Sequence, residues 1–600
     1  MSGAKSIRIG GAAGYWGDSP QAPRQLIDQG RVDYLVFDYL AEVTMSILVR
    51  AKAADPTKGY AADFVHLVMK PLLPDLKAKG IKVVVNAGGV NIAACADALR
   101  QVADAQGIAL KIGIVEGDDL MGRMGDLRKK GITEMFSGAP LPDTLASANA
   151  YLGAFPIAAA LDGGAEVVIT GRCVDSAVTL GILIHEFAWS PEAFDQLAAG
   201  TLAGHILECG AQATGGNFTD WQESAPGWDN MGYPIAECFA DGRFVISKPE
   251  GTGGIVTRLS VGEQILYETS DPQNYIVPDV ICDYSQAQLE QTGPAEVTIT
   301  GVKGKSPTDT FKVSATYRDG YRATATAVVT GFDAVAKARQ YGAALLKRVS
   351  RLLATQGLTD FEKTAVHVIG AETLWGDNAS AQAAQAREVV VQVDARHQDK
   401  AAIELFSKES TGIALSMTPG LCGVGEASRP KVTPVVAQFA FLVKKSAIVP
   451  SVSVDGVPLE FRPPQQITAP SPEPSDAPKA VAFAGPTTAC QLIDIAVARS
   501  GDKGNSANVG VMARHPAFYD VICREVTAEK VAAWFAHVTK GDVSCFAAPG
   551  MGAVNFLLCE TLDGGGTSSL HLDRLAKTYG QQILAMPVKV PTEILDRLGR

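Results

Sequence analysis

The segment Lys82-Val-Val-Val-Asn-Ala-Gly-Gly-Val-Asn91 decides the fold. Three consecutive valines form an apolar run, a glycine-rich loop follows, and residues 92–106 repeat apolar positions at helical spacing. A short strand without polar alternation is typical of a sheet that is covered on both faces, and the helix after it indicates a crossover connection. Asn91 stands where a helix N-cap is expected. The segment therefore predicts one βα unit of a parallel sheet.

The same order of strand, loop and helix recurs through the first two hundred residues. Further strands are expected at residues 6–9, 34–37, 111–115 and 166–170, each followed by a glycine-rich or acidic loop and an amphipathic stretch. This rhythm is typical of a parallel sheet with helices on both faces. We therefore predict an N-terminal Rossmann-like parallel-sheet domain over residues 1–240.

The sequence pattern of the remaining chain differs from that of the first two hundred residues. Residues 296–301, 310–317 and 323–330 alternate β-branched and polar residues, a helical pattern covers 334–355, and two more strands are expected at 364–369 and 388–393. These segments predict an α+β domain over residues 241–462. Residues 463–480 are rich in proline and poor in large apolar residues, as in an extended solvated linker. Residues 481–600 then predict a small α/β sandwich.

Composition narrows the class of protein. The chain has 600 residues, 64 acidic against 53 basic, and a net charge of −11, so no overall basic field is available to bind nucleic acid. Its ten cysteines contain no CxxC pair, which argues against a zinc ribbon or a disulfide framework. No apolar run of about 18 residues and no signal peptide are evident. We expect a cytoplasmic protein that contacts no membrane.

Polar residues follow every predicted strand of the parallel sheet. In such sheets, ligands bind beyond the carboxyl ends of the strands, so these residues are expected to converge on one rim. The residues that we predict there are Gly10, Gly11 and Gly14; Asp38 and Glu42; Asn86, Gly88, Gly89 and Asn91; and Arg172 and Asp175.

Asp38 follows a wholly apolar strand, and desolvation raises the pKa of a carboxyl group toward neutrality, as a general acid or base requires. Glu42 shares its helical face, although stabilisation of a helix N-terminus explains it equally well. Arg172 suits a substrate carboxylate or phosphate, or an ion pair with Asp175. The acidic loop 116–119 is better explained by solvation than by a metal ion, and Cys173 has no identifiable base.

Two further segments contain candidate catalytic and binding residues. His205 and Glu208 are three residues apart, the spacing of two side chains on one helical face. We predict that this pair exchanges a proton with the substrate. The alternative is that His205 is a buried histidine whose hydrogen bonds are made within the protein. The loop that follows, Gly215, Gly216 and Asn217, is predicted to contact substrate. Lys248, Gly253 and Gly254 belong to a glycine-rich loop that suits an anion.

The stretch Ala498-Arg-Ser-Gly-Asp-Lys-Gly-Asn-Ser-Ala-Asn508 combines basic side chains, glycines and small polar residues. Arg499, Lys503 and Asn505, together with backbone amides of a glycine-rich turn, would suit a phosphate or a thioester-linked nucleotide. A solvent-exposed hairpin is the alternative.

In their order and spacing, the 37–42, 86–91, 170–172, 204–217, 248–254 and 498–508 segments together resemble the acyclic terpene utilisation (AtuA) family. The likeness is to its two-part form, in which a large N-terminal region is joined to a small ferredoxin-like domain. The resemblance implies a role near the breakdown of citronellol- and geraniol-type compounds and of branched acyl-CoAs.

These observations give one leading hypothesis. We expect a lyase or hydratase that acts on a carboxylic acid or an acyl-CoA by acid/base catalysis and that is a homo-oligomer. No dinucleotide fingerprint is present, so no cofactor is implied beyond CoA as part of the substrate. The alternatives are a non-catalytic acyl-CoA-binding or assembly subunit and a metal-dependent hydrolase.

Overall fold

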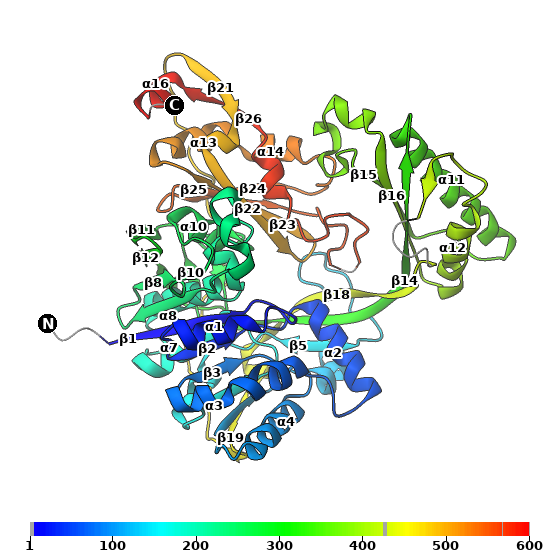
Figure 1. Cartoon of the computed structure of the whole chain (residues 1–600). Helices are drawn as coiled ribbons and strands as arrows, with labels where there is room; N and C mark the ends of the chain where they lie inside the picture. Colours follow the sequence, from blue (N-terminus) through cyan, green and yellow to red (C-terminus); the bar gives the residue numbers. More distant parts are fainter. Residues whose placement is uncertain (1–4, 424–428, 567, 599–600) are drawn as a thin grey trace.

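The computed structural model describes residues 5–423, 429–566 and 568–598, without the side chains of residues 42 and 43. The chain is a mixed α/β protein whose largest sheet has eleven strands. Figure 1 shows the N-terminal residues below, the C-terminal residues above, and the segments around α11 and α12 to one side. No helix in these described ranges is both long enough and apolar enough to cross a membrane.

Five parallel strands form the middle of the largest sheet. They lie in the order β1, β2, β3, β6, β4, and each coincides with a strand expected from the sequence. Helices cover both faces, with α1, α3 and α4 on one side and α6, α7 and α8 on the other. The bounds are β1 (Ser6–Ala13), β2 (Tyr34–Phe37), β3 (Lys82–Val85), β4 (Ile112–Glu116), β6 (Val167–Thr170), α1 (Gln21–Gln29), α3 (Lys70–Lys79), α4 (Ile92–Ala105), α6 (Phe155–Asp162), α7 (Ala177–Phe187) and α8 (Phe194–Leu207).

Antiparallel strands extend this sheet at both edges. Beyond β1 come β7 (Ile235–Phe239), β8 (Phe244–Ser247), β12 (Glu296–Thr300) and β11 (Gln288–Gly293), and beyond β4 comes β19 (Ser451–Val454). The boundary expected at residue 240 falls between β7 and β8, which pair directly. The sheet is therefore mixed, and it draws strands from both predicted domains. The domain bounds and the likeness to a Rossmann fold remain predictions.

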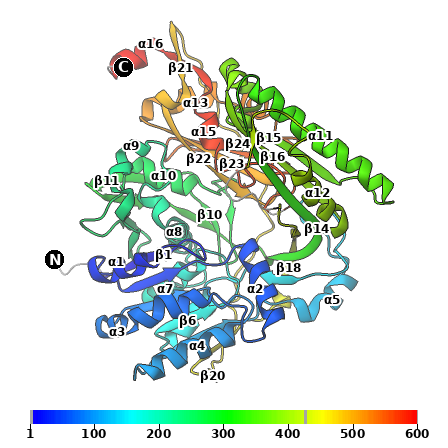
Figure 2. The ribbon, with the colours of Figure 1, turned by 45° about the vertical axis from the view of Figure 1, so that its right-hand side comes forward.

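A second sheet is organised by one long strand, β14 (Thr310–Thr330). The sequence pattern predicts two strands here, at 310–317 and 323–330. They are continuous because Gly320 adopts a φ of +78° and the pairing with β18 (Thr433–Lys444) shifts register between Arg318 and Tyr321, as in a β-bulge. Helices α11 (Ala334–Thr355) and α12 (Lys400–Gly412) cover this sheet (Figure 2).

The C-terminal module contains a four-stranded antiparallel sheet in the order β22 (Ala496–Lys503), β23 (Ser506–Ala513), β25 (Ala553–Leu558), β24 (Val543–Ala548). The 498–508 stretch is therefore a hairpin, formed by β22 and β23. Residues 463–480 have no regular secondary structure. They are nevertheless held to the protein, because Asp271 accepts hydrogen bonds of 2.8 Å from the backbone amide and the hydroxyl of Ser475.

Two buried asparagines attach the C-terminal sheet to the backbone of residues 266–270. Asn508 donates to the carbonyl of Leu266 at 2.7 Å and accepts from the amide of Glu268 at 2.9 Å. Asn555 donates to the carbonyl of Ser270 at 2.7 Å. A Cβ on Gly510 would lie 2.5 Å from the Cβ of Leu266, so the approach requires glycine at this position. The backbone of residues 266–270 and the C-terminal sheet are therefore in direct contact.

Replacing Asn508 tests this attachment. Asn508→Ala leaves buried backbone groups without partners, so we expect the free energy of unfolding to fall by about 2–4 kcal/mol. Denaturant titration followed by circular dichroism measures the change. Ser544→Ala, at an exposed position on β24, is the control and should change stability by less than about 0.5 kcal/mol. Equal effects of the two substitutions would contradict the attachment.

Candidate active site between the parallel sheet and the C-terminal hairpin

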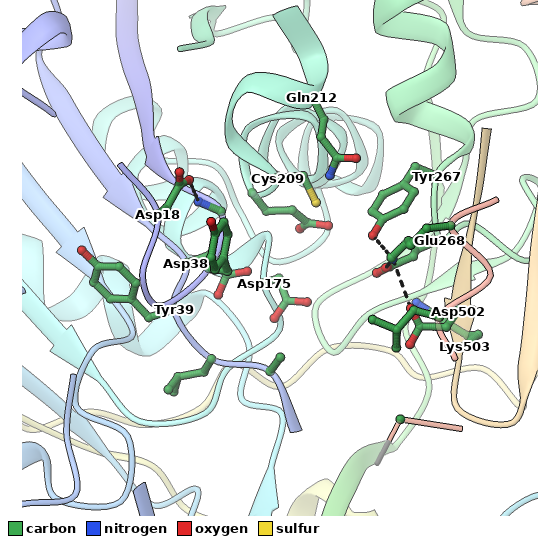
Figure 3. A pocket seen from close by; sticks show the side chains of 18 of the residues that line it. Asp18, Asp38, Tyr39, Asp175, Cys209, Gln212, Tyr267, Glu268, Asp502 and Lys503 are labelled. Carbon is green, nitrogen blue, oxygen red and sulfur yellow. Dashed lines mark hydrogen bonds and ion pairs between the residues drawn. The ribbon is translucent and has the colours of Figure 1, made fainter. Parts of the chain in front are cut away.

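A cavity of about 800 Å³ lies at the carboxyl ends of the parallel strands. One wall contains Gly14, Asp38 and Arg172, which follow β1, β2 and β6. The opposite wall contains Asp502 and Lys503 at the tip of the C-terminal hairpin. Figure 3 shows Asp38 and Asp175 facing Glu268, Asp502 and Lys503 across this space. The C-terminal module thus completes the cavity within one chain.

Asp38 is held by a fully buried asparagine. The side-chain amide of Asn86 donates to Asp38, while its oxygen accepts from the backbone amide of Tyr39 at 2.7 Å. Burial raises the pKa of Asp38 well above its ordinary value, and the charges of Asp175 and Glu208 raise it further. The positive charge of Arg172 and the Asn86 hydrogen bond oppose this shift without cancelling it. Asp38 therefore retains a proton to higher pH than an ordinary aspartate.

Glu208 and His205 form a buried pair at the end of α8. The Nδ1 atom of His205 lies 2.9 Å from an Oε atom of Glu208. Burial raises the pKa of Glu208, and the histidine only partly opposes this. Burial lowers the pKa of His205, but the Glu208 carboxylate outweighs it, so the net shift is upward.

The second oxygen of Glu208 and the Nε2 atom of His205 are buried without a hydrogen-bond partner within the described residues. Glu208 lines the cavity, whereas His205 lies behind it. The pair therefore contributes Glu208 to the cavity wall, with one of its carboxyl oxygens buried and without a partner among the described residues.

Arg172 both pairs internally and faces the cavity. Its Nη1 atom donates to Asp175 and to the carbonyl of Leu40, each at 2.6 Å, and its guanidinium lies 4.1 Å from the centre of the Tyr151 ring. The backbone amide of Arg172 donates at 2.9 Å to Asp118, whose pKa burial raises to about 6. Asp118 thus anchors the Arg172 loop. The ion pair with Asp175 is present, and binding of a substrate anion by Arg172 stays a prediction.

The facing wall carries a compact group of charges. Lys577 lies 3.0 Å from Glu268 and 3.2 Å from Asp502, and it also donates to the hydroxyl of Tyr267. Burial raises the pKa of Glu268, but Lys577 and Lys503 outweigh burial and lower it below the usual range. Glu268 is therefore ionised and paired, in contrast to Asp38.

The structure brings part of the predicted site together. Glu42 begins α2 (Glu42–Ala54), but its side chain lies outside the described residues. The predicted residues that line the cavity are Gly14, Asp38, Arg172, Asp175, Glu208, Gly216, Asn217 and Lys503.

Gly10, Gly11, Gly88, Gly89 and Asn91 do not line this cavity, because packing uses these residues, and their contacts with a substrate stay predictions. β1 extends further than expected and includes Gly10 and Gly11, where a Cβ on Gly11 would lie 2.7 Å from the carbonyl oxygen of Leu207. A Cβ on Gly88 would lie 2.6 Å from a backbone oxygen, and Gly89 has a φ of +55°. Asn91 donates to two carbonyls of residues 56–58. Asn86 acts only indirectly, by holding Asp38.

Lys248, Gly253 and Gly254 also lie away from the cavity. Lys248 donates to the carbonyl of Thr252 at 2.6 Å, which closes its own loop. Its contact with an anion stays a prediction. A Cβ on Gly254 would lie 2.4 Å from the carbonyl oxygen of Thr214. The loop therefore packs behind Gly215, which is outside the cavity wall as well.

Arg499 and Asn505 hold neighbouring loops in place. Arg499 is buried, donates to Gln212, and stacks 4.8 Å from the ring centre of Tyr267. Asn505 accepts from the amide of Gly564 at 2.7 Å. Neither residue lines the main cavity, and of the three hairpin residues predicted to bind a phosphate only Lys503 does. Phosphate binding by the hairpin stays a prediction.

Two features of the structure bear on thiol and metal chemistry at this cavity. Burial raises the pKa of Cys173 to about 12 and that of Cys209, which lines the cavity, well above its ordinary value. Both are therefore thiols rather than thiolates at neutral pH. Among the residues that the structure describes, no group of three His, Cys, Asp or Glu side chains is arranged to hold a metal ion.

Several cavity residues were missed from the sequence. Tyr267 and Glu268 follow α10 (Arg258–Leu266) without any motif, and Lys312 lies inside a strand. Lys577 belongs to a largely irregular segment. The only available signal was for Asp502, which stands in the glycine-rich 498–508 stretch. The missed residues that line the cavity include Asp18, Tyr39, Tyr151, Gln212, Tyr267, Glu268, Lys312, Gln438, Asp502 and Lys577.

Two family models match the chain. The model for "Acyclic terpene utilisation family protein AtuA" covers residues 7–454, and that for "AtuA ferredoxin-like domain" covers residues 490–589. No curated protein and no solved structure matches it. The two matches confirm the family and the two-part form inferred from the motifs.

The raised pKa of Asp38 predicts a pH-dependent effect of its replacement. Below the ordinary aspartate pKa, Asp38 is protonated in both the folded and the unfolded state, so Asp38→Asn should leave stability unchanged at about pH 3. As pH rises toward Asp38's folded-state pKa, wild-type stability falls because burial opposes ionisation. Asp38→Asn should therefore raise the unfolding temperature by a few degrees at about pH 8, measured by differential scanning fluorimetry. A stabilisation that is equal at both pH values would contradict the shift.

Proposed function

This chain belongs to the acyclic terpene utilisation family AtuA, and we propose that it is a lyase of the hydratase type in the breakdown of branched-chain or terpenoid acids. Its substrate would be a carboxylic acid or the corresponding CoA thioester. Water would be added or removed by acid/base catalysis.

One observation carries the proposal. Asp38 and Glu208 line the same cavity, and burial raises the pKa of each. Carboxyl groups with raised pKa values serve as general acids and bases near neutral pH. Arg172 and Lys503 line the same cavity and supply positive charge for an anionic substrate.

For dehydration of a 3-hydroxyacyl substrate, we assign the base to Glu208 and the acid to Asp38. Glu208 removes the proton from the α-carbon, and the negative charge that develops on the carbonyl oxygen is stabilised by Arg172 or Lys503. The bond between the β-carbon and the hydroxyl oxygen then breaks, and Asp38 donates a proton so that water leaves. The products are an α,β-unsaturated acyl group and water, and proton exchange with solvent resets both carboxyl groups.

His205 is a positioning residue in this scheme. Its Nδ1 atom lies 2.9 Å from one oxygen of Glu208, and we assign the role of base to the other oxygen, which is buried without a hydrogen-bond partner among the described residues. The ring itself packs 5.6 Å from the centre of the Tyr275 ring. The histidine thus orients the base and limits the rise of its pKa.

Substitution of the two carboxyl groups tests the assignment. Asp38→Asn and Glu208→Gln should each lower turnover by about 10²- to 10⁴-fold, because each removes one proton-transfer step. Mass spectrometry of 3-hydroxyacyl and enoyl substrates, as free acids and as CoA thioesters, measures the gain or loss of water. Asp97→Asn, an exposed acid on α4, is the control and should retain full turnover. Folded Asp38→Asn and Glu208→Gln variants with wild-type turnover would exclude this mechanism.

A further inference from the structure

A second cavity of about 400 Å³ adjoins the main one. Four residues line both spaces: Tyr151, Asp175, Lys312 and Lys503. The two cavities are therefore adjacent, and the two lysines stand at the boundary between them.

Several large apolar side chains that are exposed to solvent line the second cavity. Phe136 is 72% exposed and Ile276 is 46% exposed, and both lie at its wall with Leu442 and Met135. Large exposed apolar side chains that gather around a concavity indicate a binding surface. Val277, Pro278 and Leu557 add further apolar surface to the wall.

This wall is built from ordered segments. The amide of Met135 donates to the carbonyl of Ala440 on β18 at 2.8 Å, which fixes its loop. Glu134 accepts from the amide of Phe136 at 2.9 Å, so the phenyl ring is displayed on a defined turn. On another side, the proline-rich segment contributes Ser471, and this segment is held by the Asp271–Ser475 hydrogen bonds.

We propose that the second cavity is the subsite for the hydrocarbon chain of the substrate, and that Met135, Phe136 and Leu442 limit the length of that chain. The proposal rests on the proposed function, because it places the reacting carbonyl end in the main cavity. The occupant is a straight or branched alkyl chain attached to that end.

Binding of two homologous series tests the subsite. Isothermal titration calorimetry on the full chain compares acetate through decanoate, and acetyl-CoA through decanoyl-CoA. In the wild type, each added methylene should strengthen binding by about threefold to fourfold until the cavity is filled, in at least one series. Phe136→Ser should reduce this gain and leave the affinity for the two-carbon member unchanged. Leu442→Trp should shorten the longest chain that still gains affinity.

Phe332→Ser is the matched control, because Phe332 is 89% exposed and does not line either cavity. It should retain the wild-type dependence on chain length. A two-carbon member that binds while longer chains gain nothing would overturn the subsite and leave the proposed function standing. Retention of the full gain in both Phe136→Ser and Leu442→Trp would also overturn it. A gain that persists while neither Arg172→Ala nor Lys503→Ala weakens any member would support the subsite and contradict the proposed function.

Discussion

The close contact between the C-terminal sheet and the backbone of residues 266–270 is the constraint on which the site depends. Asn508 and Asn555 hold this backbone by hydrogen bonds, and Gly510 leaves the space for it. Gly501 does the same beside Glu268, because a Cβ there would lie 2.7 Å from the Cγ of Glu268. The contact places Tyr267 and Glu268 at the cavity together with the hairpin tip. Without it, the rim of the parallel sheet would face open solvent.

The two walls that meet in this way differ in their electrostatics. On the C-terminal side, Glu268 and Asp502 are each within 3.2 Å of Lys577, and their charges are compensated. On the side of the parallel sheet, burial raises the pKa of both Asp38 and Glu208, and the negative charge of Asp175 raises both further. Ion pairs stabilise the structure of a site, whereas carboxyl groups whose pKa values are raised by burial can exchange protons near neutral pH. The chemistry is therefore assigned to the sheet side and the closure of the cavity to the other.

Local pattern predicted the parallel strands and the rim residues Asp38 and Arg172, because apolar runs fix strands and strand ends fix the rim. Glu208 was predicted from its helical spacing to His205. Local pattern did not separate the glycines that line the cavity, such as Gly14 and Gly216, from those used in packing. Gly11 and Gly88 are required by backbone packing, and a loop glycine of this kind looks the same in sequence as one that contacts a ligand. Lys312 and Lys577 reach the cavity through contacts between distant segments. Such long-range placement leaves no local signal in a single sequence.

A crystal structure of the full chain with a bound 3-hydroxyacyl or enoyl substrate tests the central claim most directly. The account predicts that the carbonyl oxygen lies within hydrogen-bond distance of Arg172 or Lys503, and that the α- and β-carbons lie between Asp38 and Glu208. A substrate bound elsewhere would contradict it, for example one beside Trp221 and Trp228 in the neighbouring cavity, with the space around Asp38 empty. In that case the raised pKa values of the two carboxyl groups would have a structural origin only.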